Sequence, residues 1–274
     1  MGESPSPGNA VFGPLERHFI AYGTRFEIRA DDAAGLAALA ARAGSLEWTA
    51  STASEPAVRY RLQRRSSGEA VPDFTLRVGD EVLAEGGVDE MLESFEDHAK
   101  LQTALHARDV IFVHAGAVSW RDRAIVIPGA SRAGKSTLVR ALLDEGATYY
   151  SDEFAVFDAA GHVKPYALPL SIRTDDPRRR LRIPIREPSD AAPGPVPVGL
   201  VVVTRYTAGA RWRPRPLSRG KAFLALMANT VAARSVPERA MKTLSAAVAP
   251  ADAVTGVRGD ARRAARAILA AAAW

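Results

Sequence analysis

Cysteine is absent from this chain of 274 residues, which excludes disulfides and thiolate metal sites. That absence fits a reducing compartment, so we expect a cytoplasmic protein. Long uncharged apolar runs are also missing, so the sequence predicts no membrane span and no membrane partner. The first eight residues are polar and lack the apolar centre of an export signal.

Charge of one sign is only slightly in excess. The chain carries 36 Lys and Arg residues against 31 Asp and Glu residues, a net charge of +5. Such a charge would suit a nucleic-acid partner. Arginine far outnumbers lysine, however, which is typical of a high-GC genome, and an enzyme that binds phosphate is also somewhat basic. We therefore expect no nucleic-acid partner.

No chemical motif marks the first hundred residues. Residues 1–14 contain three prolines and three glycines and are predicted to be a disordered lead-in. Residues 15–100 are predicted to form a small α+β domain. Its expected elements are a strand-like stretch over 19–29, a helix over 32–42 begun by an aspartate, an alternating strand over 58–62, a hairpin over 74–83 and a helix over 88–107. In the last helix, Phe95 falls on the apolar face and Glu96 away from it.

Residues 101–274 alternate strand and helix patterns, which predicts an α/β domain. The expected strands cover 110–119, 124–128 and 199–204, with two short extended pieces within 148–158. The expected helices cover 135–145, 221–229, 237–248 and 260–273, the first of them ended by Gly146.

The strongest signal is the loop Gly129-Ala130-Ser131-Arg132-Ala133-Gly134-Lys135-Ser136, which matches G-x-x-x-x-G-K-[ST] at every fixed position. The glycines let backbone N–H groups curl toward phosphate oxygens, and the following helix adds its positive N-terminal end. In such loops the lysine, here Lys135, reaches the β- and γ-phosphates, and the hydroxyl, here Ser136, binds Mg²⁺. An apolar strand before the loop and a helix after it supply the structural context that this motif requires. The loop and the next residue, Thr137, are therefore predicted to bind a nucleoside triphosphate with Mg²⁺.

Motifs of the other phosphate-loop classes are missing. The guanine-reading Asn-Lys-x-Asp of GTPases does not occur, and neither does the Leu-Ser-Gly-Gly-Gln of transporter ATPases. The apolar strand over 199–204 ends in Thr204, not in the aspartate of the Walker-B form. ATP is therefore the expected nucleotide, and carboxylates must come from elsewhere.

Two further features near the loop are candidates for chemistry. The acidic pair Asp152-Glu153 follows a strand-like segment that would return beside the loop. One carboxylate could then ligate Mg²⁺ while its neighbour accepts a proton from an attacking hydroxyl; the alternative is an acidic turn facing solvent. His114 lies on the strand expected to pair with the one that enters the loop, although a lone histidine on a strand is more often structural.

Together Val113–Gly116, Gly129–Ser136 and Ser151–Glu153 resemble the catalytic core of the HPr kinase/phosphorylase superfamily. They resemble especially the HPr-kinase-related proteins found beside bacterial peptide-modification genes. The resemblance covers residues 105–175 well and the remainder weakly. It implies a mixed core sheet and ATP-dependent transfer of phosphate to a Ser or Thr hydroxyl of a peptide or small protein.

The resemblance also implies a role for each matching residue. Lys135 and the loop backbone would hold the ATP phosphates. Ser136 and Glu153 would hold Mg²⁺, and Asp152, beside the metal, would be the general base. His114 would support that carboxylate or the transferring phosphate. Members of the superfamily often form homo-oligomers, and the resemblance carries that option to this chain.

Two positions depart from the superfamily pattern. The second member of the acidic pair is usually aspartate and is Glu153 here, which can still ligate Mg²⁺. True HPr kinases carry a glycine-rich signature downstream, whereas the corresponding Leu168–Arg173 contains no glycine. This second departure argues against HPr as the substrate and against a reverse phosphorylase activity.

Arginines crowd the segment from 173 to 186, and six prolines fall between 177 and 197. The prolines predict a long irregular loop, and such loops often act as lids. Arg173, which follows an apolar stretch, is the residue expected to neutralise transition-state charge. The alternatives are a surface that holds an acidic peptide and a solvated charge run.

Three functions fit these features. The first is a kinase for a Ser or Thr hydroxyl of a peptide or small protein. The second is a small-molecule or sugar kinase with the same apparatus, and the third is a non-catalytic, ATP-dependent peptide-binding module. ADP formation separates the third from the others, and the acceptor separates the first two.

Overall fold

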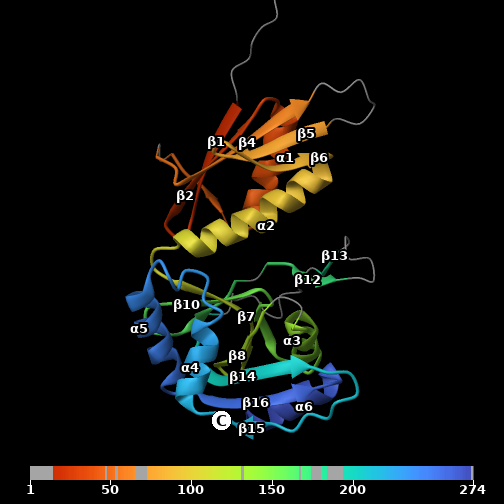
Figure 1. The fold of residues 1–274 in the computed structure, drawn as a ribbon, viewed down its shortest axis with the longest axis vertical. Coiled ribbons are helices and arrows are strands. Elements are labelled where there is room, and N and C mark those ends of the chain that lie inside the picture. The colour runs from red at the N-terminus through yellow and green to blue at the C-terminus, as the bar shows by residue number, and fades with distance from the viewer. Residues whose placement is uncertain are drawn as a thin grey trace, which may run out of the picture. The chain divides into compact units, whose positions relative to one another are not determined.

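The computed structural model describes residues 15–46, 48–52, 55–65, 73–130, 133–166, 168–173, 180–183, 194–272 and 274. The chain divides into two compact units, Met1–His106 and Ala107–Trp274 (Figure 1). Within the described ranges, every helix is too short or too polar to cross a lipid bilayer.

The first unit is a six-stranded sheet, in the order β3-β1-β2-β4-β5-β6, with two helices. In chain order its elements are β1 (Leu15–Ala21), β2 (Thr24–Ala30), α1 (Ala33–Gly44), β3 (Thr49–Ala50), β4 (Val58–Arg65), β5 (Asp73–Val78), β6 (Glu81–Gly86) and α2 (Val88–His106). Only β2 and β4 pair in parallel, because α1 carries the chain back between them. Asp32 begins α1 as expected, since its carboxylate accepts a hydrogen bond from the Gly35 N–H at 2.9 Å.

The strand-like stretch over 19–29 forms strands as expected, and it is divided between β1 and β2 by a turn that was not predicted. Tyr22 and Gly23 form a tight turn between β1 and β2, with φ values of 49° and 77°. Two successive positive φ values give the turn that matches the twist of paired strands. The buried apolar positions are Phe19 and Ala21 before the turn and Phe26, Ile28 and Ala30 after it, so the alternation shifts by one residue across the turn.

Aromatic side chains fill the core of the first unit. The ring of Trp48 stacks on Phe26 at 3.8 Å between centroids and meets the edge of Phe95 at 5.8 Å. Tyr60 meets Phe95 edge-on at 4.9 Å. These four rings join β2, β4 and α2, and burying rings of this size supplies much of a small domain's core energy.

Glu96 lies inside the first unit, which corrects the expectation that it faces away from the apolar side of its helix. Its carboxylate lies 2.5 Å from Arg42 of α1 and 2.7 Å from Lys100 of α2, and only 6% of the residue is exposed. A buried carboxylate requires such partners. The pair with Arg42 therefore joins α1 to α2, a contact that helical periodicity alone does not predict, while the pair with Lys100 lies within α2.

The second unit is α/β with a mixed eight-stranded sheet. Its strands are β7 (Ile111–Trp120), β8 (Arg123–Pro128), β9 (Thr148–Ser151), β10 (Phe154–Phe157), β11 (Val163–Lys164), β14 (Val198–Tyr206), β15 (Arg215–Pro216) and β16 (Asp252–Arg258). Their order is β11-β10-β7-β8-β14-β16-β15, with β9 also paired to β7. The three strands β8, β14 and β16 are parallel, whereas β7 runs antiparallel to β8.

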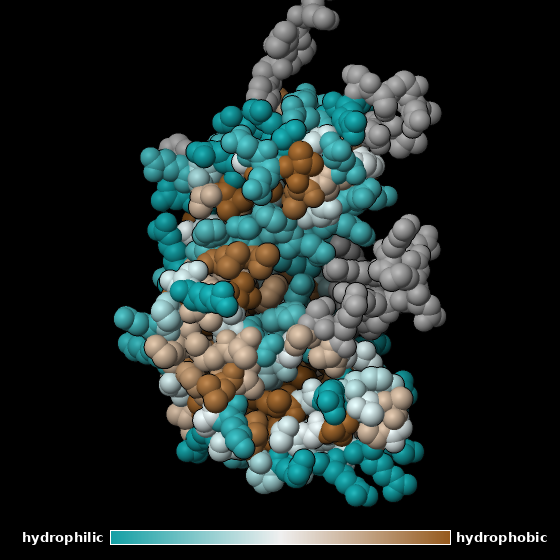
Figure 2. Space-filling view, viewed as in Figure 1, coloured by the Kyte–Doolittle hydropathy of each residue, from teal (hydrophilic) through white to brown (hydrophobic). Residues whose placement is uncertain are grey.

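Helices cover both faces of this sheet. They are α3 (Lys135–Asp144), α4 (Arg219–Met227), α5 (Pro237–Val248) and α6 (Ala261–Ala271). The faces divide by alternation along β8, because Val126 packs in one core cluster with α4 and α5, while Ile125 and Ile127 pack in the other with α3 and α6. Figure 2 shows separate apolar patches with hydrophilic side chains between them; Leu224 of α4, 63% exposed, is one exposed apolar residue.

The arginine-rich segment is not irregular throughout its described part. Two short strands, β12 (Leu170–Arg173) and β13 (Arg180–Ile183), pair antiparallel, with Arg173 opposite Arg180. The expectation of one long irregular loop was therefore wrong for β13, whereas β12 includes the apolar stretch expected before Arg173. The prolines that suggested it lie between or beyond the two strands, where they interrupt no strand pairing.

Candidate functional site

The phosphate-binding loop lies between a buried strand and a helix, as its motif requires. β8 enters it, and α3 begins at Lys135, directly after Gly134. Gly134 has φ 77°, a left-handed conformation that favours glycine. The packing of α3 against β7 also requires a glycine at position 116, because a Cβ there would lie 2.7 Å from Val139 Cγ2. Glycine at 116 therefore lets α3 pack close against β7.

Lys135 is buried and points back over the loop. Its Nζ donates to the carbonyl oxygens of Gly129 at 2.9 Å and Ala130 at 3.1 Å. The same Nζ lies 3.4 Å from Nε2 of His114. Burial lowers the pKa of Lys135, while the charges of Glu153 and Asp152 act in the opposite direction. The acidic pair is therefore close enough to stabilise the ammonium.

His114 lies on β7 beside the acidic pair, opposite Phe154 in the register of β7 and β10. Its backbone carbonyl accepts from the Gly129 N–H at 3.3 Å, which connects the strand to the start of the loop. Burial and then the positive charge of Lys135 lower the pKa of His114, while Glu153 raises it. A lowered pKa keeps this imidazole neutral at neutral pH, so it can accept a hydrogen bond.

The acidic pair forms a tight turn between β9 and β10, both of which pair with β7. Ser151 Oγ accepts from the backbone N–H groups of Glu153 at 3.2 Å and Phe154 at 3.0 Å, which holds the turn. Asp152 is 7% exposed, and its Oδ1 accepts from the Tyr149 hydroxyl at 2.8 Å. Burial and then the Asp152 charge raise the pKa of Tyr149, so the hydroxyl stays protonated as a donor.

The acidic turn therefore differs from the solvent-facing alternative. Asp152 is buried, and both carboxylates act electrostatically on Lys135. The structure also gives the pairing of the returning strand, which the sequence did not specify. β9 pairs with β7 and not with the loop's own strand β8, so β7 lies between the acidic turn and β8.

Arg258, at the end of β16, is a site residue that sequence reasoning missed. Its Nη2 donates to the carbonyl oxygen of Gly134 at 2.6 Å and contacts that of Ala133 at 3.4 Å. The residue is 1% exposed, and burial lowers the pKa of its guanidinium. The sequence carries no motif around Arg258. The only signal was the run Asp252–Arg258, which alternates weakly as a strand would.

Not every expected residue can be placed. Ser131 and Arg132 of the loop lie outside the described residues. Arg173 ends β12, and the backbone of β12 approaches α3; its side chain is outside the described part. Thr137 is exposed on the first turn of α3, and Ser136 is half-buried there.

The donor set suits Mg²⁺. Mg²⁺ binds one or two carboxylates together with substrate phosphates and water. The Ser136 hydroxyl at the start of α3 and the carboxylates of Asp152 and Glu153 are oxygen donors of this kind. Glu153 lies beside β7, since its carbonyl oxygen accepts from the Ala115 N–H at 3.1 Å, one residue after His114.

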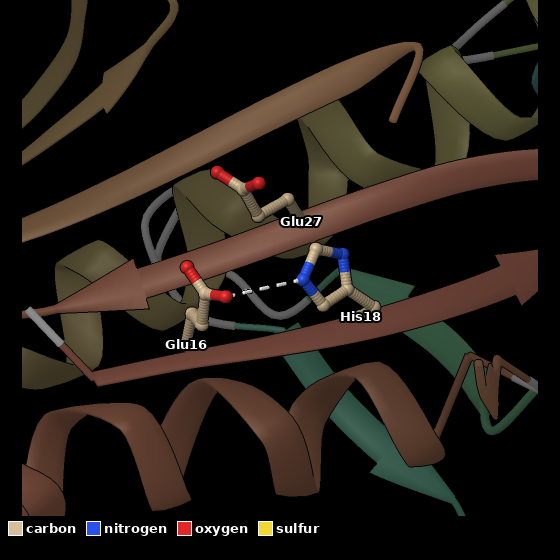
Figure 3. A group of neighbouring side chains, drawn as sticks. All are labelled: Glu16, His18 and Glu27. Atoms are coloured by element: carbon tan, nitrogen blue, oxygen red, sulfur yellow. Dashed lines mark ion pairs between the residues drawn. The ribbon is translucent and has the colours of Figure 1, made fainter. Parts of the chain in front are cut away.

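A separate charged cluster lies in the first unit, where Glu16, His18 and Glu27 project from β1 and β2 with ligand atoms within 4.8 Å of one another (Figure 3). His18 Nε2 lies 3.5 Å from Glu16. Arg29 Nε lies 2.8 Å from Glu27 and 3.2 Å from Glu16. Arg29 thus already supplies the positive charge that these two carboxylates need, and we describe the cluster as an ion-pair network.

Comparisons with protein-family models and with curated proteins identify no relative of this chain. No protein-family model matches the chain, and a search of curated proteins finds no significant match.

Proposed function

We propose that this protein is an ATP- and Mg²⁺-dependent kinase that transfers the γ-phosphate to a Ser or Thr hydroxyl of a peptide or small protein. The observation that carries the proposal is the convergence of three separate segments. Lys135 of the loop lies 3.4 Å from His114, and its charge is stabilised by Glu153 and Asp152. The HPr-kinase-like pattern of these segments supports the choice of acceptor.

In the proposed reaction, the loop amides and Lys135 bind the phosphates. The acceptor oxygen forms a bond to the γ-phosphorus, the bond from that phosphorus to the β–γ bridging oxygen breaks, and ADP leaves. The hydroxyl proton passes to the Asp152 carboxylate, which Tyr149 orients through its hydrogen bond. Mg²⁺, held by Ser136 and Glu153 with Asp152 beside it, would neutralise charge on the phosphates.

The neutral His114 has a positioning role in this scheme. Its Nε2 lies within reach of Lys135 Nζ, so it orients the ammonium toward the loop. Arg173 is retained as a candidate for the charge on the transferring phosphate, since β12 approaches α3. An arginine in that position commonly contributes to phosphoryl transfer.

Incubation with γ-labelled ATP, Mg²⁺ and peptides bearing Ser or Thr, including the products of neighbouring genes, tests the proposal. We expect Lys135→Ala to lower transfer by about 100-fold or more and Asp152→Asn by roughly 100- to 10,000-fold. Arg140→Ala and Asp144→Asn are the matched controls, because these residues form an exposed ion pair on the same helix. Transfer by Lys135→Ala and Asp152→Asn at the parent's rate would refute the assignment.

A further inference from the structure

A cavity of about 1080 Å³ lies beside the start of α3, where β14 and β16 end. We call it the β14–β16 cavity; its lining includes Gly134, Thr137, Tyr206 and Trp212. Small-molecule sites typically enclose ~300–1,000 Å³, so this cavity can accept a nucleoside. Gly134 and Thr137 belong to the phosphate loop and the helical turn after it, which makes the cavity continuous with the loop.

The position of the cavity relative to the sheet determines which end of a bound triphosphate would point toward it. Because β8, β14 and β16 are parallel neighbours, their carboxyl ends meet at one edge, where ligands bind in open α/β sheets. The acidic turn and His114 lie on the other side of β8, on β7 and its neighbours. A triphosphate with its γ end at the acidic turn therefore directs its α end toward the β14–β16 cavity.

Two aromatic side chains line the cavity. Tyr206 is 55% exposed, and the Arg258 guanidinium lies 5.8 Å from its ring centroid. Trp212 is half-buried against the core beneath α3 and α6. Gly256 leaves room for it, since a Cβ there would lie 3.0 Å from the indole. Aromatic faces and arginine planes are the groups on which nucleobases stack.

The wall of the cavity is held in place by backbone contacts. The Thr207 N–H donates to the Arg258 carbonyl at 2.8 Å, and a Cβ on Gly259 would lie 2.4 Å from the Ala210 carbonyl oxygen. The segment after β14 is therefore packed closely against the start of α6. Arg258 contacts both this segment and the loop carbonyl of Gly134, so one side chain joins the cavity to the phosphate-binding loop.

We propose that the β14–β16 cavity holds the base and ribose of the nucleotide, with Tyr206 and Trp212 as the groups that stack on the base. The inference rests on the proposed binding of a nucleoside triphosphate by the loop. Four arginines also line the cavity, namely Arg211, Arg258, Arg262 and Arg263. Arg258 is buried, whereas Arg211, Arg262 and Arg263 are exposed, and their guanidinium planes can extend the stacking surface. The positive charge of these three side chains suits a ligand attached to phosphate.

Titration calorimetry with ATP and with inorganic tripolyphosphate, both with Mg²⁺, tests this assignment on the full chain. We expect the parent to bind ATP at least tenfold more tightly than tripolyphosphate. Tyr206→Ala and Trp212→Ala should each weaken ATP binding by about tenfold, in the range of base stacking on an aromatic ring, and leave tripolyphosphate binding unchanged. Leu224→Ala, an exposed apolar truncation on α4, should change neither.

The outcomes separate this inference from the proposed function. If the parent binds tripolyphosphate and ATP equally, the base subsite is wrong and the phosphate loop stands. If both variants lose the two ligands in parallel, the cavity does not recognise the base and the inference is again overturned. If the parent binds neither ligand, the proposed function fails with it. Tyr206 is exposed, so Tyr206→Ala decides the question even if Trp212→Ala does not fold.

Discussion

His114 experiences opposing electrostatic effects from two neighbours. Burial and the charge of Lys135 lower its pKa, whereas Glu153 raises it, and the net pKa is below the ordinary 6.5. The unfolded chain therefore takes up this proton near pH 6.5, before the folded protein does. The contribution of His114 to the free energy of unfolding is present above pH 6.5 and falls as the pH falls from 6.5 toward the folded pKa.

Neutralising Lys135 should change the titration of His114. In Lys135→Met the pKa of His114 should rise toward its ordinary value, because a positive neighbour is removed. NMR titration of the imidazole signals measures this, and His114→Gln identifies the signal. The imidazole signals of the exposed His106 should be the same in both proteins and serve as an internal control. An unchanged His114 pKa would mean that the two side chains are not coupled.

Gly116 sets the closeness of α3 to β7. In Gly116→Ala the new methyl group would meet Val139 Cγ2 at 2.7 Å, and overpacking of this kind costs about 1–3 kcal/mol of unfolding free energy. In a Val139→Ala background the same substitution should cost much less. Urea unfolding of the four proteins of this cycle measures the coupling.

A matched glycine controls for the effect of alanine itself. Gly220 lies in α4 with no atom near its absent Cβ, so Gly220→Ala should be neutral or slightly stabilising. An equal cost of Gly116→Ala with and without Val139→Ala would show that the packing explanation is wrong.

The residues of the motif could be identified from the sequence because a loop of eight neighbours carries its own pattern. His114 and the acidic pair were also predicted as candidates, because they fall on strands next to the loop. Arg258 could not be predicted as a site residue, because its hydrogen bond to Gly134 joins residues that are 124 positions apart. A local sequence pattern does not predict a contact over so large a separation, and an isolated arginine is ordinarily a surface residue.

At the scale of elements, the ion pairs of Glu96, one to α1 and one within α2, are open to a direct test. Glu96→Ala removes the carboxylate that Arg42 and Lys100 both contact, and loss of a buried partner of this kind costs about 3–5 kcal/mol. Glu93→Ala, on the exposed side of the same helix, should change stability by less than about 0.5 kcal/mol. Urea unfolding followed by circular dichroism distinguishes the two; equal effects would contradict a stabilising role for the buried carboxylate.

Helices and strands could be predicted where the apolar side chains within the element itself recur at a regular spacing. The helix over 237–248 and the strands around the acidic pair match the prediction, because apolar spacing and a flanking proline or turn residue define them locally. β16 was missed because its residues Asp252–Arg258 include Gly256 and only two are buried, Ala253 and Arg258. Its place in the sheet is fixed by pairing with β14, which no residue within β16 specifies.

For the whole molecule, two units with their own cores predict two unfolding transitions. Phe95→Ala truncates the aromatic core of the first unit, and Leu244→Ala truncates the core of the second. Each substitution should cost roughly 2–5 kcal/mol and lower one transition by about 10 °C or more, with little effect on the other. Differential scanning calorimetry measures both; a single transition shifted by either variant would mean that the chain unfolds as one unit.

The contact between Arg258 and Gly134 also bears on how the protein is made. The loop residues leave the ribosome long before β16 does, and β14 can join β8 before its second neighbour exists. The guanidinium that holds the loop carbonyl of Gly134 is synthesised 124 positions after that glycine. Nascent chains that lack β16 would therefore carry the whole phosphate motif without this support, and the loop would acquire its final conformation only after β16 has joined the sheet.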